Sequence, residues 1–228
     1  MAKREKKAHI EFENKKYLRI PLKTHVVMRD DNLQEVVKKY ASDSLEDGDI
    51  LFVSEKIVAI TQGRAIPLKD IHPRPLAKFL SGHVTKTPAG IGLGMPETME
   101  MALRECGVPR ILYAAAASAV TKVFGRKGVF YEIAGYRAQA IDGPTPNTLP
   151  PYNQYVVLGP DRPDEVAKEL AQLLNCKVAV VDINDIDGVI LGVSESGMNR
   201  AAIKSILKDN PLGQDHEQTP MGIIRVVK

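Results

Sequence analysis

The most constraining feature of this sequence is an irregular alternation of short apolar strands with amphipathic helices. The run ILFVSEKIVAI at 50–60 is typical of a buried strand that leads into a second element, and VAVV at 178–181 is typical of a strand. Apolar residues recur at helical spacing over 33–40 and 163–174. Because nothing repeats at a period of twenty to fifty residues and the βαβ rhythm is not strict, the pattern predicts an α/β or α+β fold around a mixed sheet.

The remaining elements follow from local signals. Pro96 and Gly107 frame a helix at 97–106, because proline suits the first helical turn and glycine the position after the last. The run GPTPNTLPPYN cannot form regular structure, since proline lacks an amide hydrogen. We expect helices at 75–80, 114–123 and 199–208, an extended segment at 17–27, and strands at 9–13, 110–113, 129–134, 136–142 and 221–227.

The charge distribution separates a leader from the rest of the chain. The 228 residues carry a net charge of +3, and much of the excess lies within the first sixteen. We therefore expect residues 1–16 to form a basic, partly disordered leader and residues 17–228 to form a single domain. RNA or DNA binding through this leader is an alternative, but the overall balance does not favour a nucleic-acid partner.

Composition also narrows the compartment and the partners. Cys106 and Cys176 show no metal or disulfide spacing, which predicts a reduced, cytoplasmic protein. The most apolar stretch, 113–120, is too short to cross a bilayer, so no membrane partner is expected. The chain has no tryptophan and twelve other aromatic residues, which argues against stacking platforms for bases.

An acidic cluster is the most informative local feature. Asp182, Asn184, Asp185 and Asp187 follow directly on the buried run KVAVV. Oxygen ligands at the end of a strand suit Mg²⁺ or Mn²⁺, which prefers one or two carboxylates with waters and phosphate oxygens. The alternative interpretation is an Asx-rich turn without a metal.

Two further loops could supply polar groups. Asp142 ends a predicted strand just before a Gly-Pro break, where a turn aspartate is also common. The loop 209–219 is rich in side-chain oxygen, although a solvated hairpin loop would look similar. If these loops converge with the acidic cluster, they would form a divalent-cation site. Lys56, at a junction between a strand and a helix, could meet a phosphate or point to water.

Several segments together resemble the CofE-like gamma-glutamyl ligases, which add glutamate to the deazaflavin coenzyme factor 420. The resemblance lies in IPLK at 20–23 and LEDGDILFVSEKIVAITQGRAIPLKDIHP at 45–73, then in AIDGPTPNT, KVAVVDINDIDG and DNPLGQDHEQTPMGIIR. It implies a mixed α/β subunit in an intertwined homodimer. It also implies an amide ligase that uses GTP and Mg²⁺ or Mn²⁺ to activate a carboxylate as an acyl phosphate, which L-glutamate then attacks. The acceptor would be the deazaflavin coenzyme or a folate-like carboxylate.

The resemblance also implies roles for matching residues. Asp142 and Asp185 would be catalytic. The metal would be held by a set comprising Asp142, Asp182, Asn184, Asp185 and Glu217. The nucleotide would be bound by Leu22, Lys23, Ser54, Glu55, Lys56, Asn147, Gln214 and Gln218.

The chain departs from the family pattern in three places. Ile60 stands where the founding members carry a lysine, and INDIDGVILG lacks the expected Gly-Arg segment. A middle segment before the last helix is also shorter. The chain therefore resembles a shorter, divergent paralogue with a different acceptor or altered activity. A non-catalytic nucleotide- or metabolite-binding protein on the same scaffold is the alternative function.

Overall fold

A computed structural model describes residues 6–84, 92–126, 128–145, 148–185, 188–213 and 216–227. Its chain forms two compact units, one comprising residues 1–63 and 160–228 (unit 1) and the other residues 64–159 (unit 2). The expected mixed α/β fold is confirmed. The assignment of 17–228 to one domain stays a prediction, and residues 9–12 of the basic leader form the first strand of the sheet of unit 1.

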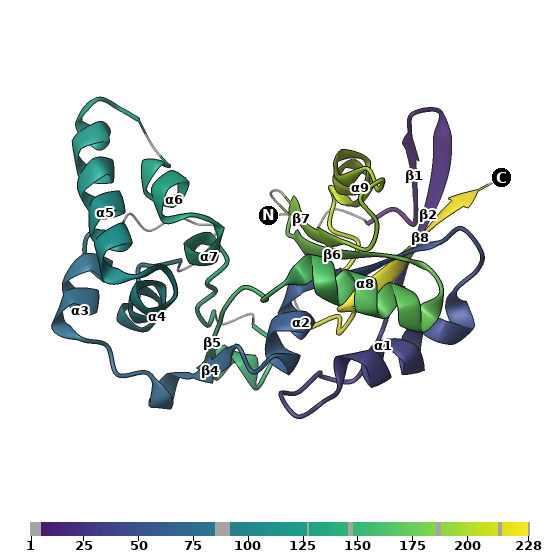
Figure 1. Ribbon diagram of the computed structural model, residues 1–228, viewed down its shortest axis with the longest axis horizontal. Helices are drawn as coiled ribbons and strands as arrows, with labels where there is room; N and C mark the ends of the chain where they lie inside the picture. Colours follow the sequence, from purple (N-terminus) through teal and green to yellow (C-terminus); the bar gives the residue numbers. More distant parts are fainter. Residues whose placement is uncertain are drawn as a thin grey trace. The chain divides into compact units, whose positions relative to one another are not determined.

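Unit 1 is built on a six-stranded mixed sheet (Figure 1). Across the sheet, β2 pairs antiparallel with β8, β8 antiparallel with β3, and β3 parallel with β6. Strands β2, β3 and β6 therefore run in one direction, and β1, β8 and β7 run in the other. In spatial order the strands are β1 (His9–Phe12), β2 (Lys15–Leu22), β8 (Met221–Val227), β3 (Ile50–Ser54), β6 (Lys177–Ile183) and β7 (Gly188–Val193).

Helices cover both faces of this sheet (Figure 1). On one face, Phe52, Val181 and Ile224 pack with residues of α9 (Arg200–Leu207). The opposite face is covered by α1 (Leu33–Ala41), α2 (Glu55–Thr61) and α8 (Pro163–Leu174). Since successive strand residues point to opposite faces, burial on both sides explains why residues 50–53 and 178–181 are all apolar.

Unit 2 is mainly helical. A short ribbon pairs β4 (Ala65–Pro67) with β5 (Tyr155–Val157). Its core includes Met99, Ile111, Ile141 and Leu158. The helices are α3 (Pro75–Ser81), α4 (Pro96–Cys106), α5 (Val108–Val123), α6 (Val129–Ala134) and α7 (Tyr136–Gln139). Short 3-10 helices lie at Leu68–Asp70 and Tyr152–Gln154 in this unit and at Ser42–Ser44 in unit 1.

Three predicted strands of unit 2 are wrong, because the structure places them in helices. The range 110–113 belongs to α5, 129–134 forms α6, and 136–139 forms α7. Their β-branched and aromatic residues suggested strands, but burial follows the helical period in α5, where Ile111 and Ala114 are the buried residues. Gly128 and Gly135, both at positive φ, bound α6 and make its ends abrupt.

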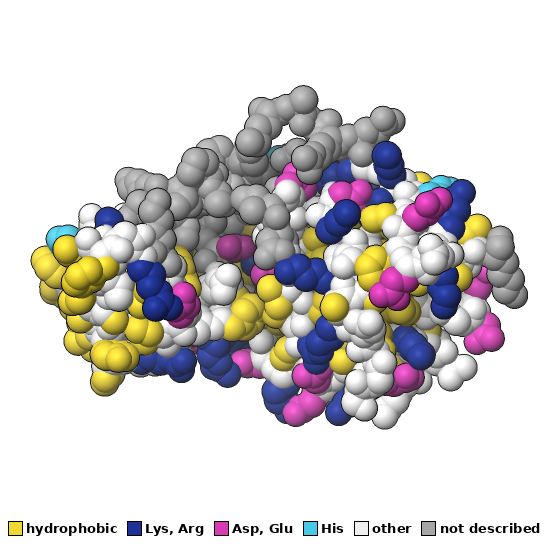
Figure 2. All heavy atoms as spheres, turned by 90° about the horizontal axis from the view of Figure 1, so that it is seen from above, with side chains coloured by type: hydrophobic (Ala, Val, Ile, Leu, Met, Phe, Trp, Pro, Cys, Tyr) yellow, Lys and Arg dark blue, Asp and Glu magenta, His cyan; other side chains and the backbone are white. Residues whose placement is uncertain are grey.

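The outer face of α5 leaves large apolar side chains in solvent. Leu112, Tyr113, Val120, Val123 and Phe124 are 42, 67, 60, 84 and 82% exposed. Figure 2 shows hydrophobic side chains gathered at its left-hand end, whereas charged side chains are scattered over the rest of the visible face. Within the described ranges, no helix has both the length and the hydropathy of a membrane span.

Candidate functional site

The ends of five strands bring most of the predicted site residues of unit 1 to one edge of the sheet, which we call the loop edge. Strands β2, β3 and β6 end there at Leu22, Ser54 and Ile183. Strands β8 and β7 begin there, since they run antiparallel to their neighbours. Open α/β sheets bind ligands outside the carboxyl ends of their parallel strands, so this edge is the candidate site.

Ser54 joins the loop edge to the helical layer. Its backbone amide donates to the carbonyl oxygen of Pro220 at 2.8 Å, which fixes the loop before β8 beside the end of β3. Its hydroxyl caps α2 by accepting from the amide of Lys56 at 3.3 Å. Residues 54–56 therefore turn from strand to helix at a fixed position beside Pro220.

Glu55 and Lys56 form an ion pair at the start of α2. The ammonium of Lys56 donates to the carboxylate of Glu55 at 2.8 Å. The carboxylate is 2% exposed and the lysine side chain 33% exposed. A buried carboxylate needs a charged partner, so Glu55 anchors the lysine stem while part of the lysine side chain still faces solvent.

A backbone contact links the end of β2 to the loop before β8. The amide of Thr24 donates to the carbonyl oxygen of Gln218 at 2.9 Å. Leu22 is buried, and Lys23 is exposed beside it. Gln218 adopts a positive φ of 57°, which turns the chain toward β8. The predicted nucleotide residues 22, 23 and 218 are thus near one another along the loop edge.

The residues of the acidic cluster lie at the end of β6 and just beyond it, and they do not all lie on the same face of the sheet. Ile183 packs into the α9 core with Ala179 and Val181, so alternation places Asp182 on the opposite face of the strand. Asp185 lies beyond the strand, and its carboxylate accepts from Asn210 Nδ2 at 3.1 Å and lies 4.0 Å from Lys6 Nζ. Asp185, 58% exposed, is therefore the acidic residue that the structure joins to the loop after α9.

The loop after α9 is held by its own interior contacts. Asn210 is fully buried, and its Nδ2 also donates to the carbonyl oxygen of Gly213 at 3.1 Å. The carboxyl group of Glu217 packs against Gly213, where an added Cβ would lie 2.5 Å from Glu217 Cδ. Thr219 donates from its hydroxyl to the carbonyl oxygen of Leu212. The described residues of this loop therefore enclose a buried polar side chain, Asn210, which a solvated hairpin loop would lack.

Asp142 belongs to unit 2. The predicted strand that it should end is absent, and Asp142 instead forms an isolated bridge with Val157, two backbone hydrogen bonds of 2.9 Å. Its neighbour Ile141 is 1% exposed and anchors the segment, while Asp142 itself is exposed. Asn147, Gln214 and Asp187, the last member of the acidic cluster, lie outside the described residues.

Sequence reasoning missed two residues that organise the loop edge. Arg19, in the middle of β2, is buried and binds the loop after α9 through Asp209. Asn210 was expected only as part of a polar surface loop. A charged residue within an apolar strand was the available signal for Arg19, and an Asn-Pro step after a helix was the signal for Asn210.

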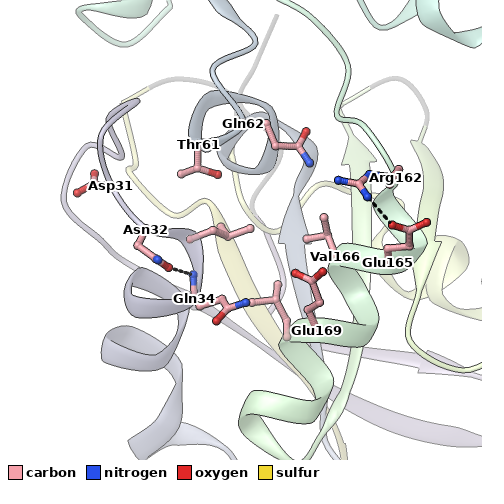
Figure 3. Close-up of a pocket in the computed structure, with 11 residues that line it drawn as sticks. Asp31, Asn32, Gln34, Thr61, Gln62, Arg162, Glu165, Val166 and Glu169 are labelled. Atoms are coloured by element: carbon pink, nitrogen blue, oxygen red, sulfur yellow. Dashed lines mark hydrogen bonds and ion pairs between the residues drawn. The ribbon is translucent and has the colours of Figure 1, made fainter.

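A separate polar hollow of about 380 Å³ lies among the helices of unit 1 (Figure 3). It is lined by residues at the start of α1, at the end of α2 and along one side of α8, including Asn32, Gln62 and Glu169. Its single arginine, Arg162, pairs with Glu165 at 3.0 Å. Three carboxylates and one guanidinium line this hollow, which disfavours a triphosphate there, and none of the predicted site residues is among its lining.

The donors at the loop edge fit a hard divalent cation in kind. Asp182, Asn184 and Asp185 offer carboxylate and amide oxygens, the ligands that Mg²⁺ takes together with waters and phosphates. Within the described ranges, however, no three His, Cys, Asp or Glu side chains stand close enough to form a complete cage.

Two comparisons with known proteins find relatives of this chain. The family model described as F420-0:Gamma-glutamyl ligase matches residues 21–208. The chain is also 31% identical over 172 residues to the coenzyme F420:L-glutamate ligase of Methanopyrus kandleri. This similarity covers 74% of the chain and 58% of that protein, so the chain spans little more than half of the curated relative.

Proposed function

The chain belongs to the F420-0:gamma-glutamyl ligase family, and from this premise we propose that it is an amide ligase that joins L-glutamate to a carboxylate of a coenzyme. The observation that carries the proposal is the family match over residues 21–208, which includes four of the strand ends at the loop edge. The proposed acceptor is a deazaflavin or folate-like coenzyme with a free carboxylate.

The proposed reaction has two steps with GTP as co-substrate. A carboxylate oxygen of the acceptor attacks the γ-phosphorus of GTP, and GDP leaves. The nitrogen of L-glutamate then attacks the acyl carbon of the resulting acyl phosphate, inorganic phosphate leaves, and the nitrogen loses its proton as the amide forms. Positioning and electrostatic stabilisation carry both steps, because phosphoryl transfer requires little covalent participation from the protein.

The loop edge supplies the proposed nucleotide contacts. Lys23 is exposed and Lys56 is partly exposed, so both ammonium groups can approach phosphate oxygens. Glu55 orients the Lys56 side chain through the 2.8 Å ion pair. Because Glu55 is itself buried, it would act on the nucleotide through Lys56 and not by direct contact. The segment 217–220 lies beside the ends of β2 and β3, because Gln218 and Pro220 accept backbone hydrogen bonds from Thr24 and Ser54.

We propose that Mg²⁺ or Mn²⁺ is held in unit 1 by Asp185, with Asp182, Asn184 and Glu217 as further candidate ligands. The metal-ligand role that the resemblance implies for Asp142, in unit 2, stays a separate prediction. When bound, the cation would neutralise charge that develops on the phosphate oxygens. Asp185 is favoured because Asn210 fixes its carboxylate at 3.1 Å.

One observation favours the alternative of a non-catalytic nucleotide- or metabolite-binding protein. Ile60 stands at the position of an expected lysine, is 5% exposed, and lies on the buried face of α2. This chain therefore has a buried apolar side chain, and no cation, at that position. Binding without turnover would then be the retained property of the scaffold.

The experiment that tests the proposal follows the glutamyl unit. The protein is incubated with GTP, Mn²⁺, isotopically labelled L-glutamate and candidate acceptors, and products are analysed by mass spectrometry. A product heavier by one glutamyl unit, dependent on GTP, supports the ligase. Absence of product together with a GTP-induced rise in melting temperature favours the binding protein. A ligand present at a hundred times its Kd raises the free energy of unfolding by about 2.7 kcal/mol, which such a measurement detects.

A homodimer is also proposed. Its support within the described residues is the exposed apolar face of α5, with large side chains at both ends and alanines between them. In an antiparallel pairing of two copies, Leu112 and Tyr113 would meet Val123 and Phe124 of the second copy across the alanines. Such a pairing is self-complementary, as a twofold interface requires.

A further inference from the structure

The side chain of Asn210 connects two loops of the proposed site. From the loop after α9 it donates one hydrogen bond to Asp185 Oδ1 at 3.1 Å, and another to the carbonyl oxygen of Gly213, also at 3.1 Å. Asp185 follows β6, and Gly213 packs against Glu217. One amide group thus contacts the acidic cluster and braces the glycine that supports Glu217.

The orientation of this amide is fixed by its partners. Both neighbours of Nδ2, a carboxylate and a carbonyl, can only accept, so the nitrogen must point to them. Asn210 Oδ1 then faces the interior, where it is buried with no hydrogen-bond partner in the structure. A buried acceptor without a partner lowers the stability of the fold by about 1–3 kcal/mol. The fold therefore gains nothing from Asn210 Oδ1, and the contribution of this side chain lies in the two hydrogen bonds that Nδ2 donates.

The backbone conformation also suits asparagine. Asn210 has a φ of 50°, in the left-handed region that asparagine and glycine adopt most readily. Its amide donates to the carbonyl oxygen of Leu207 at 2.9 Å, which places it directly after the last turn of α9. Helix α9 ends in the core, so the side chain projects from a rigid base toward Asp185.

We infer that Asn210 is a positioning residue for the metal-binding carboxylate Asp185, an inference that rests on the proposed function. The two Nδ2 hydrogens hold the Asp185 carboxylate and the carbonyl oxygen of Gly213 in one arrangement before any substrate binds. Partners of this kind, which do not touch the metal, typically change metal affinity 10- to 100-fold when they are removed.

The test compares divalent-cation binding with nucleotide binding. Asn210→Gly keeps the left-handed backbone and removes both hydrogen bonds. The Kd for Mn²⁺ is measured by electron paramagnetic resonance with GTP present, and the Kd for GTP alone by calorimetry in EDTA. Asn175→Gly is the matched control, because Asn175 has a φ of 51° and caps α8 beside the start of β6, at the opposite edge of the sheet. Asn210→Ser, with a side chain too short to reach Asp185, replaces the glycine variant if circular dichroism shows the latter to be unfolded.

We expect Asn210→Gly to weaken Mn²⁺ binding at least tenfold, with GTP binding in EDTA within twofold of the wild type and Asn175→Gly unchanged in both. In an Asp185→Ala background, Asn210→Gly should cause no further loss, because it acts through that carboxylate. Unchanged Mn²⁺ affinity in Asn210→Gly, or an equal loss with and without Asp185, overturns the inference. Absence of Mn²⁺ binding by the wild-type protein would instead overturn the metal site of the proposed function.

Discussion

The guanidinium of Arg19 forms a bidentate ion pair with the carboxylate of Asp209, and Arg19 is 2% exposed. Arg19 also donates to the carbonyl oxygen of Ile206 at 3.0 Å and to that of Lys7. It therefore binds the last turn of α9, the loop that follows it, and the segment before β1. Since Asn210 is the next residue after Asp209, this buried cation sets the position from which Asn210 reaches Asp185.

Replacing Arg19 with leucine should destabilise unit 1 strongly. The change leaves the partly buried Asp209 without its cation, and breaking such a pair costs about 3–5 kcal/mol in buried sites. Because Asp209 is 27% exposed, we expect about 2–3 kcal/mol, measured by urea unfolding. Arg162→Ala, which breaks an exposed pair with Glu165, is the control and should cost less than about 1 kcal/mol. Equal losses in the two variants would contradict the special role of Arg19.

Stability should fall in acid through Asp209. Burial raises the pKa of this carboxyl, but hydrogen bonds and charge from Arg19 outweigh burial, so the pKa lies below its ordinary value. A carboxyl with a lowered folded pKa stabilises the protein above its unfolded pKa, near pH 4, and that stabilisation is lost as pH falls through the folded value. Urea midpoints measured from pH 7 to pH 3 should show a smaller acid loss in Arg19→Leu than in the wild type. Parallel curves would count against this linkage.

Gly213→Ala should disturb Glu217. Gly213 has a φ of 88°, and an added Cβ would lie 2.5 Å from Glu217 Cδ and 2.7 Å from Glu217 Oε2. We expect a loss of stability of about 1–3 kcal/mol together with weaker Mn²⁺ binding, measured by unfolding and by electron paramagnetic resonance. Gly48→Ala is the matched control, because Gly48 has a φ of 85° and nothing within 4 Å. It isolates the backbone strain, so the excess effect in Gly213→Ala reports displacement of Glu217.

Asp142→Asn should abolish glutamyl transfer and leave the fold unchanged. The backbone of Asp142 is fixed by its two hydrogen bonds to Val157, which the substitution preserves. The loss of negative charge removes a proposed metal ligand. Product formation is followed by mass spectrometry, and Asp70→Asn, at an exposed aspartate in the same unit, serves as the control. Full activity in Asp142→Asn would remove this carboxylate from the mechanism.

Val123→Glu should weaken self-association if α5 forms the proposed dimer contact. Val123 is 84% exposed, so the change costs the single chain little, whereas a buried glutamate opposite Tyr113 of a second copy would be costly. Sedimentation velocity over a range of concentrations should show a shift from dimer to monomer. Val226→Glu, at a 49% exposed valine of the sheet in unit 1, is the control and should leave the association state unchanged. A dimer that persists in Val123→Glu would exclude this face.

Local signals were sufficient where one pattern dominated the segment. The apolar run that begins at Ile50 and the run at 178–181 indicated buried strands, and both lie in strands of the sheet. Pro96 and Gly107 marked the ends of α4 for the same local reason. In unit 2 the local signals failed, since α5 and α6 use β-branched and aromatic residues whose helical state depends on packing into the core around Met99 and Ile111.

By itself, the sequence determined which residues could carry chemistry: the carboxylates after β6, the serine and lysine after β3, and the polar loop before β8. Only the tertiary structure decided that residues 22, 54, 183 and 218 share one sheet edge, because pairing between strands distant in sequence depends on the whole core. It also decided that Arg19 and Asn210 are buried. Those side chains acquire their roles from partners about 190 and 25 residues away, Asp209 and Asp185, which no local pattern can reveal.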